Sequence, residues 1–462
     1  MPTIELGDLA GGSRGQPTGP DRTTAHRTDR RRAARRGAVR PFLLGAMLIV
    51  VLGTVAAGNP FPRPWPESVV PARLGATVLA GRDWLVVSEP DRSGPGVRGG
   101  RELVAYGLPG VEPRWRLSPP DVVDDLQVLG DRLLLTTHPE PSLARSARLT
   151  VLDVRTGTVA WERQAILMVS SDGGDLVLWT TAGDGRPGAP AGSGRLEAVD
   201  PASGAVRWSL PVPDGVLPRF DATSADPTAP ARASTLVLAL PSGLVEVRDL
   251  GTGAVVRAVR LPVPVTGSPP RFDAEVTTGM FLVYDESTVT GYRLPELDRR
   301  WSVRTDPQRG RGPVACGADL CSLRPQRGVR VWDPRTGATR WSDGRWTRLW
   351  AVGDALVAAE GSGPDGALAV LDPATGRVLA DLGAMGHLTP RGARLVGVRY
   401  GADRRARVLE FDPATWRARL LAVLSEVSGD CRLSATVLHC RRMDASIGVW
   451  RLPGRQRADT SG

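Results

Sequence analysis

The chain has 462 residues, including 54 Gly and 40 Pro, and its formal net charge is +10. All 59 basic residues are Arg, and about half of the positive excess lies in residues 1–40, so the rest of the chain has an ordinary solvated surface that does not favour a nucleic-acid partner. The high Gly and Pro content indicates many tight turns and few long helices.

A charge-free apolar segment follows at residues 41–58, PFLLGAMLIVVLGTVAAG. Eighteen helical residues span about 27 Å, close to the thickness of the hydrocarbon core of a bilayer. Basic residues gather just before this segment, at Arg35, Arg36 and Arg40. We therefore expect a disordered cytoplasmic tail (1–40) and a transmembrane signal-anchor (41–58), which place the rest of the chain outside the cell membrane. A signal peptide cleaved after the small residues 55–57 stays open as an alternative, and it also exports the body.

A turn phrase recurs along most of the chain, and it is clearest at 329–341, VRVWDPRTGATRW. Asp can cap a turn, Pro fixes φ at the next position, and Gly adopts the left-handed conformation that closes a hairpin turn with a bulge. The repeated turn positions are Asp153, Gly157, Asp200, Gly204, Asp249, Gly253, Asp333, Gly337, Asp372, Gly376 and Asp412. Looser forms at Gly107, Arg293 and Arg451 complete a series with steps of 39 to 49 residues. This period of short strands is typical of propeller blades.

Five Trp residues stand eight positions after the first residue of a turn. They are Trp115, Trp161, Trp208, Trp301 and Trp341. We expect them on outer strands, where a large ring fills the wedge between neighbouring blades. Their regular spacing around a ring favours packing over a single ligand site.

All four cysteines lie in the exported part as two close pairs, Cys316 with Cys321 and Cys431 with Cys440. Each pair precedes a repeat position by a similar distance. An oxidising compartment lets disulfides persist, so we predict one disulfide within each pair. A metal site is the alternative, but the spacings do not match zinc ligand patterns.

The repeats LTVLDVRTGTVAW (149–161), LEAVDPASGAVRW (196–208) and VRVWDPRTGATRW (329–341) resemble those of PQQ-like (pyrroloquinoline-quinone-type) β-propellers. That superfamily includes quinoprotein alcohol dehydrogenases, BamB envelope-assembly lipoproteins and extracytoplasmic sensor domains. The resemblance implies an all-β propeller of four-stranded blades over 70–453, after a linker at 59–69 and before a disordered tail at 454–462. Eight blades are preferred and seven to nine are allowed, since residues 65–70 could complete the last sheet.

Polar, Gly- and Pro-rich segments interrupt the repeats at Asp91–Arg101, His138–Ala147, Ala182–Gly194 and Asp221–Ala233. We expect them to be loops at blade edges. Loops on the faces of a ring are the favoured places for contacts with a partner.

Two functions remain open. Quinoprotein dehydrogenases use a catalytic Asp, a Ca²⁺ ion held by acidic and amide groups, and often a disulfide between adjacent cysteines, whereas this chain has no adjacent cysteines, no Lys and a single Asn, Asn59. We therefore predict no catalytic, cofactor-binding or metal-binding residues and no cofactor. The leading hypothesis is a non-catalytic, membrane-anchored propeller that binds envelope proteins, peptides or glycans. The alternative is a quinoprotein-type oxidoreductase with a divergent site.

Overall fold

The structure of the protein is a computed structural model that describes residues 65–452 apart from internal gaps. The gaps are 91–99, 140–146, 182–192, 215, 217, 224–227, 263–272, 286–287, 305–312, 325–327, 353–354, 362–365, 392–393, 402 and 435. The chain divides into two compact units, Met1–Phe61 and Pro62–Gly462, and the described residues all belong to the second. The predicted tail 1–40, the predicted membrane helix 41–58 and the tail 454–462 lie outside the described residues. The described part contains no helix that could cross a membrane.

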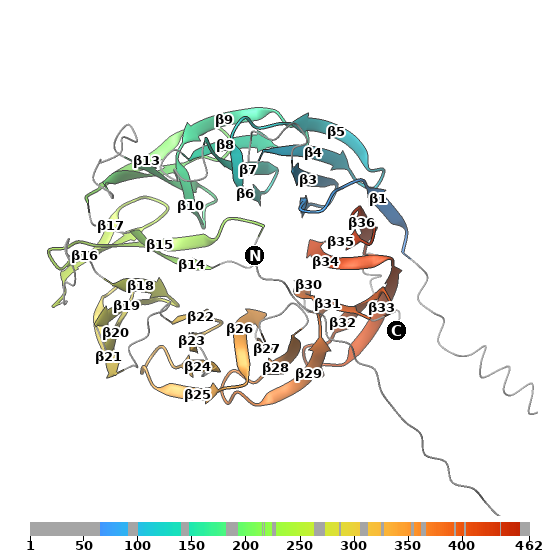
Figure 1. Ribbon diagram of the computed structural model, residues 1–462. Coiled ribbons are helices and arrows are strands. Elements are labelled where there is room, and N and C mark those ends of the chain that lie inside the picture. The colour runs from blue at the N-terminus through green and yellow to red at the C-terminus, as the bar shows by residue number, and fades with distance from the viewer. Residues whose placement is uncertain are drawn as a thin grey trace, which may run out of the picture. The chain divides into compact units, whose positions relative to one another are not determined.

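Strands are the only regular elements in the described residues, and they form small antiparallel sheets arranged in a ring (Figure 1). We call each four-stranded unit a blade and number the blades in chain order. Blades 1 and 2 consist of β2 (Thr77–Ala80), β3 (Trp84–Pro90), β4 (Arg101–Gly107) and β5 (Glu112–Leu117), then β6 (Val122–Leu129), β7 (Arg132–His138), β8 (Arg148–Asp153) and β9 (Val159–Gln164). Blades 3 and 4 consist of β10 (Ile166–Ser171), β11 (Leu176–Thr181), β12 (Gly194–Val199) and β13 (Val206–Val212), then β14 (Pro218–Thr223), β15 (Arg232–Ala239), β16 (Leu244–Asp249) and β17 (Val255–Arg260).

The second part of the ring has the same strand order. Blades 5 and 6 consist of β18 (Ala274–Thr277), β19 (Met280–Asp285), β20 (Thr288–Arg293) and β21 (Asp298–Arg304), then β22 (Val314–Cys316), β23 (Asp319–Arg324), β24 (Gly328–Trp332) and β25 (Thr339–Asp343). Blades 7 and 8 consist of β26 (Trp346–Val352), β27 (Ala355–Glu360), β28 (Ala367–Leu371) and β29 (Val378–Ala384), then β30 (His387–Arg391), β31 (Arg394–Tyr400), β32 (Arg405–Phe411) and β33 (Ala418–Ser425). Blade 9 consists of β34 (Val427–Ser434), β35 (Val437–Arg442), β36 (Ile447–Arg451) and β1 (Glu67–Val70).

The described strands therefore make nine blades. Seven of them are separate sheets, and blades 3 and 4 join into one eight-stranded sheet because β10 pairs in parallel with β15. Nine is within the predicted range but corrects the preferred number of eight. The ninth blade arises from closure of the ring, since β1 pairs antiparallel with β36 and Glu67 lies opposite Trp450. The first strand of the ring thus comes from the segment that we assigned mainly to a linker.

The middle strands of each blade are buried on both faces, because each blade packs between two others. In β3, for example, the consecutive residues Leu85, Val86 and Val87 are all buried. Strands covered on both sides have continuous apolar runs instead of the alternation seen in half-exposed sheets. The first strands, by contrast, face the centre of the ring and are partly exposed (Figure 1).

The repeated turns all have one geometry. In the turn that starts at Asp200, the carboxylate accepts hydrogen bonds from the backbone amides of Ala202 and Ser203, at 2.8 and 3.0 Å. Gly204, with φ +69°, donates its backbone N–H to the Asp200 carbonyl at 2.8 Å. The strand register shifts by one residue beside this turn, between Ala198 and Val199, as expected for a bulge.

A Trp–turn contact joins neighbouring blades at five places. In each, the indole of a fourth strand covers the glycine of the next blade's turn, and its Nε1 donates a hydrogen bond to a carbonyl of that turn. The bonds are Trp115 to Val154 (3.0 Å), Trp161 to Pro201 (3.1 Å), Trp208 to Leu250 (2.9 Å), Trp301 to Pro334 (2.7 Å) and Trp341 to Pro373 (2.8 Å). The glycines beneath them are Gly157, Gly204, Gly253, Gly337 and Gly376. The five Trp residues that we expected on outer strands thus lie on fourth strands and contact the next blade.

The junction between blades 7 and 8 has a different arrangement. Ala380 takes the Trp position of blade 7, and Trp416 takes the Gly position in the turn of blade 8, with φ +54°. Both residues pack against the same apolar cluster. The large ring is therefore supplied by the turn instead of by the outer strand.

Two disulfides lie at matching places in blades 6 and 9. Cys316 bonds to Cys321 and Cys431 bonds to Cys440, with Cα separations of 5.8 and 4.0 Å. Each bond links the first strand of its blade to the second strand. These are the pairs that the sequence predicted, and the described part contains no other cysteine.

Candidate functional site

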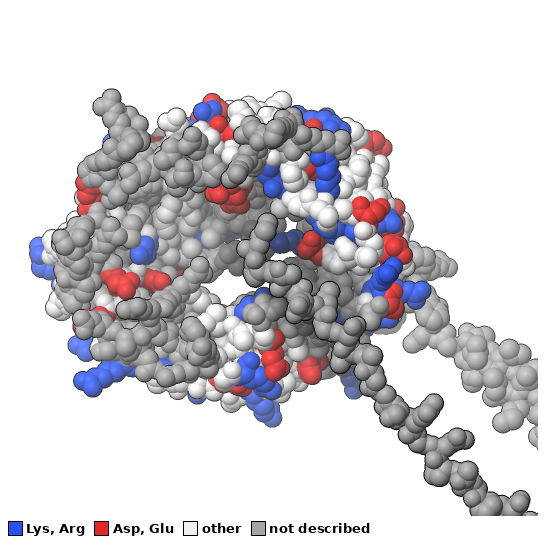
Figure 2. Space-filling model, in the orientation of Figure 1, with Lys and Arg blue, Asp and Glu red and all other residues white. Residues whose placement is uncertain are grey.

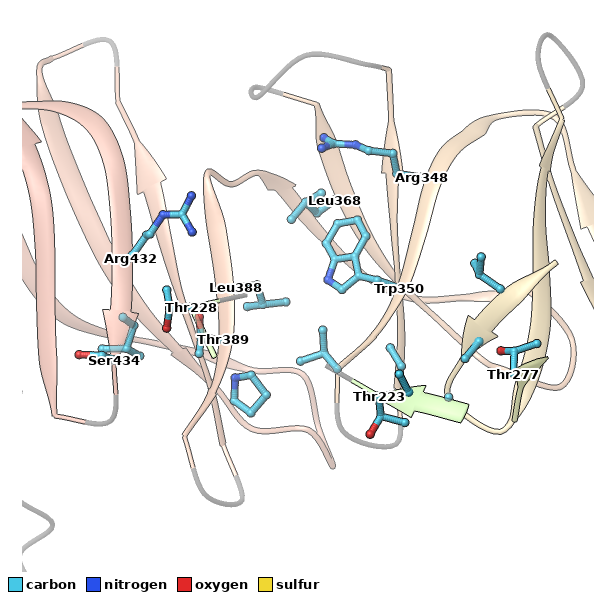
Figure 3. Close-up of a pocket in the computed structure, with 18 of the residues that line it drawn as sticks. Thr223, Thr228, Thr277, Arg348, Trp350, Leu368, Leu388, Thr389, Arg432 and Ser434 are labelled. Atoms are coloured by element: carbon cyan, nitrogen blue, oxygen red, sulfur yellow. The ribbon is translucent and has the colours of Figure 1, made fainter. Parts of the chain in front are cut away.

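The first strands of blades 4 to 9 line a large cavity in the central channel, with a volume of about 1520 Å³. The cavity is where this face of the ring is hollowed in the space-filling view (Figure 2). Its described lining mixes apolar and polar side chains. The lining includes Arg348, Trp350 and Arg432 as well as Leu388, which is itself mostly buried (Figure 3).

Strand β26 supplies two of these side chains. Side chains of a strand alternate between its faces, so Arg348 and Trp350 lie on the same side of β26. Both line the cavity, and the Trp350 ring also packs against the apolar cluster of blades 7 and 8. The strand therefore presents a guanidinium group and an indole side by side.

Strand β34 of blade 9 faces β26 across the cavity. Arg432 extends from β34, and its guanidinium group and that of Arg348 point toward one another across the open space (Figure 3). Leu388, on β30 of blade 8, lies between these two strands (Figure 3). We call Arg348, Trp350, Leu388 and Arg432 the arginine wall.

The opposite side of the cavity holds one more basic and one acidic side chain. Arg219 donates from Nε to the carbonyl of Ala274 at 2.7 Å, which ties blade 4 to blade 5. Glu275 accepts a hydrogen bond from the Tyr284 hydroxyl at 3.3 Å. Burial, helped by the nearby Glu275 charge, raises the pKa of Tyr284, so this hydroxyl stays protonated. Three Arg side chains thus face one carboxylate in the described lining, which gives the cavity a net positive charge.

A second cavity of about 410 Å³ lies against blades 1, 2 and 9. It is lined by both signs of charge, with Asp124 and Asp125 on β6 and Arg432 shared with the larger cavity. Arg101 is held there by Ser88, whose hydroxyl accepts from its Nε at 2.7 Å, and burial lowers the pKa of Arg101. The mixed charges make this space less suited to a ligand of one sign.

Between the two cavities runs the connection from β14 to β15, of which residues 228–231 are described. Thr228 lines both cavities, and its carbonyl accepts a hydrogen bond from the backbone N–H of Val128 in blade 2 at 2.7 Å. The carbonyl of Ala231 accepts from the backbone N–H of Ser170 in blade 3 at 2.8 Å. This connection belongs to the segment 221–233, which we expected to be a loop at a blade edge, and it lies instead along the inner strands of two other blades.

No group of three His, Cys, Asp or Glu side chains that could hold a metal ion occurs in the described part of the chain. The predicted turn and Trp residues lie at blade junctions, away from the cavities. The arginine wall was not predicted, because the recognisable turn and Trp pattern marks the third and fourth strands of each blade and leaves the first strand unmarked. A signal was present in TRLWAV (347–352), just before a buried strand. Arg348 and Trp350 stand two positions apart there, so a strand would place them on the same face.

Comparison with known proteins gives one family match and several similar solved structures. The sequence profile of the family described as outer membrane protein assembly factor BamB matches residues 63–260. No curated protein matches the chain. Among solved structures, BamB from Moraxella catarrhalis is 15% identical, over 84% of this chain and 99% of that chain, with a TM-score of 0.37. The computationally designed protein Ika8 is 16% identical over 72% and 97% of the two chains (TM-score 0.41), and a eukaryotic initiation factor is 12% identical over 77% and 91% (TM-score 0.47).

Proposed function

We propose that this PQQ-like, BamB-type β-propeller is a non-catalytic binding module that holds a segment of an envelope protein in its central channel. The observation that carries the proposal is the cavity of about 1520 Å³, into which blades 7 to 9 extend the arginine wall. Its volume is above the usual range of small-molecule pockets, about 300–1,000 Å³, so it has room for a segment of a larger molecule. A concave site with a few charged groups and an aromatic ring suits recognition of another molecule.

The chemistry of the lining favours binding over catalysis. Guanidinium groups are positively charged hydrogen-bond donors, so Arg348 and Arg432 can attract anions. A quinoprotein site would also need a divalent cation held by several oxygen ligands, and Glu275 is the carboxylate in the described lining. These points support the binding hypothesis over the oxidoreductase.

We propose further that the ring works outside the cell membrane, held there by the apolar segment 41–58. The basic residues before that segment favour this orientation. The two disulfides agree with it, because such bonds persist in oxidising compartments.

A crosslinking experiment tests the binding proposal in the native envelope. A photoreactive aromatic amino acid replaces Trp350, which lines the channel and is partly exposed, or, as a control, Val256, which is exposed on the outer strand β17. Irradiation of cells that make the full chain should join the 350 variant, and not the 256 variant, to another envelope protein. Adducts only at 256, or at neither position, would contradict the proposal.

The oxidoreductase alternative predicts a different result. Full chain in detergent, titrated with pyrroloquinoline quinone and Ca²⁺, should give no saturable heat of binding and no dye reduction with alcohols. Saturable binding in the micromolar range, about −8 kcal/mol, would favour the alternative.

A further inference from the structure

The disulfide between Cys431 and Cys440 lies in blade 9, the blade that closes the ring. We propose that this bond is a redox-controlled latch on ring closure, and that the matching bond between Cys316 and Cys321 has no such role. Oxidation holds the ring shut, and without the bond β1 separates more readily from β36. The latch goes beyond the proposed binding function, and only its timing rests on the proposed location outside the membrane.

The bond lies where the backbone pairing of blade 9 is irregular. The register between β34 and β35 shifts twice, from Val427 to Gly429 and from Gly429 to Arg432. Cys431 falls within this irregular stretch, so the disulfide supplies a covalent link where the ladder of backbone hydrogen bonds is disrupted. In blade 6, by contrast, β22 pairs with β23 without a shift of register.

The residues next to the two cysteines hold the seam between blades 9 and 1. Asp430 precedes one cysteine, Arg441 follows the other, and their side chains form an ion pair at 3.2 Å. Arg441 is buried and donates hydrogen bonds to the carbonyls of Arg73 and Ala76, which lie between β1 and β2. The disulfide therefore fixes the position of the guanidinium group that connects the last blade to the first.

The disulfide of blade 6 lies in a different setting. Blade 6 receives the indole of Trp301 on its own turn, and its Trp341 donates to the turn of blade 7. These two contacts remain if the bond between Cys316 and Cys321 is lost. At the seam, Ser68 stands where five other blades carry Trp, so closure depends more strongly on the strands that the disulfide of blade 9 holds together.

The latch is set by thiol–disulfide exchange. Two thiols lose two electrons and two protons as the bond forms, and a disulfide oxidant such as oxidised glutathione is reduced to two thiols. Cys431 and Cys440 are only 3% and 0% exposed in the closed ring. The exchange therefore precedes complete closure, and the closed ring then shields the bond from reductants. At the proposed location, the chain meets the oxidant only after export.

The test uses the full chain in detergent and two variants that each lack one disulfide, C431A/C440A and C316A/C321A. Hydrogen–deuterium exchange, read by mass spectrometry, follows β1 at the seam and β11 of blade 3 as an internal reference. In C431A/C440A the exchange rate of β1 relative to β11 should rise about tenfold, because loss of the bond favours local opening of the seam. In C316A/C321A this ratio should stay within about twofold of the wild type.

A second measurement isolates the redox step. The chain has four cysteines, so C316A/C321A keeps only the pair of blade 9. Refolding of this variant with oxidised or with reduced glutathione changes that bond alone. The reduced form should show the same rise of about tenfold in the β1 ratio. This comparison also provides the test if C431A/C440A does not fold.

Two results would overturn the latch. One is a β1 ratio that stays at the wild-type value in C431A/C440A or in the reduced form of C316A/C321A. The other is an equal rise in both variants, which would mean that either disulfide supports the whole ring alike. Adducts from position 350 report the binding function separately, so either proposal can fail alone.

Discussion

Both junctions contain apolar contacts and Arg side chains, but between blades 2 and 3 an indole contacts the turn of the next blade, whereas at the matching place between blades 9 and 1 a serine hydroxyl contacts that turn. Trp161 covers Gly204 and donates to the Pro201 carbonyl. At the closure, Arg441 donates to the carbonyls of Arg73 and Ala76, and Ser68 donates from its hydroxyl to the Pro109 carbonyl. Both contacts hold the fourth strand of one blade against the turn of the next, through an indole in one case and a hydroxyl in the other.

The difference follows from how each junction is encoded. A Trp–turn contact needs one Trp on the fourth strand of a repeat and one turn in the next repeat, so it can be copied along the chain. Blade 9 takes its fourth strand, β1, from the other end of the chain, and Ser68 lies in that strand where other blades carry Trp. Closure therefore depends on residues that belong to no repeat.

The largest effect is expected at the closure. Replacement of Arg441 by Met removes hydrogen bonds to the carbonyls of Arg73, Ala76 and Ala445 and an ion pair with Asp430, and it leaves the Ala76 carbonyl buried without its partner. We expect a loss of about 4 kcal/mol in the free energy of unfolding, measured by urea denaturation and circular dichroism. Arg442→Met is the matched control, because this neighbour forms one partly exposed ion pair, with Glu67, and should cost about 1 kcal/mol or less. Equal losses would show that the buried bonds of Arg441 are not what holds the closure.

A smaller loss is expected at a Trp–turn contact. Trp161→Ala opens a space over the turn of blade 3 and removes a hydrogen bond, which should cost about 3 kcal/mol. Leu420 stands at the corresponding strand position of blade 8 but is exposed, so Leu420→Ala should cost less than about 1 kcal/mol. The same denaturation experiment measures both variants. A similar loss in the free energy of unfolding for both would show that the contact of the indole with the turn adds no stability.

The turn side of the contact can be probed alone. Gly204 and Gly130 both have positive φ, +69° and +60°, but an added Cβ would meet the Trp161 ring at 2.9 Å only at position 204. Gly130→Ala should cost about 1 kcal/mol through backbone strain, and Gly204→Ala about 1 kcal/mol more through displacement of the indole. Melting temperatures of the two variants measure the difference. Equal melting temperatures would mean that the Trp161 indole moves aside without loss of stability.

The smallest effect concerns pH. Backbone amides that donate to Asp200, Asp372 and Asp412 hold the pKa values of these carboxylates below their usual range. The resulting stabilisation is present above the ordinary Asp pKa of about 4 and is lost as pH falls through the lower folded values. The variant D200N/D372N/D412N should therefore lose less of its melting temperature than the wild type between pH 5 and pH 2.5. If the variant and the wild type lose the same melting temperature between pH 5 and pH 2.5, groups other than these three carboxylates cause the acid sensitivity.

The sequence predicted the repeat because its turns are local. Asp, Gly and the following Trp act within a few residues or on the next repeat, so their spacing specifies the blade and its third and fourth strands. The blade number depended on a contact between β1 and β36, from opposite ends of the chain, and no local pattern measures that contact. The preference for eight blades therefore fell one short.

The channel was harder to predict for a similar reason. Arg348 and Arg432 lie 84 positions apart and meet only because the ring brings β26 and β34 to one cavity. Each is an ordinary exposed Arg in its own repeat. The connection at residues 228–231 also contacts blades 2 and 3 through its backbone, which leaves no side-chain signature.

The closing strand also sets the order in which the ring can be completed. Glu67 and its ion-pair partner Arg442 are 375 residues apart in the sequence, so β1 leaves the ribosome long before β35 and β36 exist. Until then β1 has no strand to pair with, and blade 1 has an uncovered side. During synthesis the chain must therefore remain an open arc, whose exposed strand edges are prone to aggregation until the ring closes.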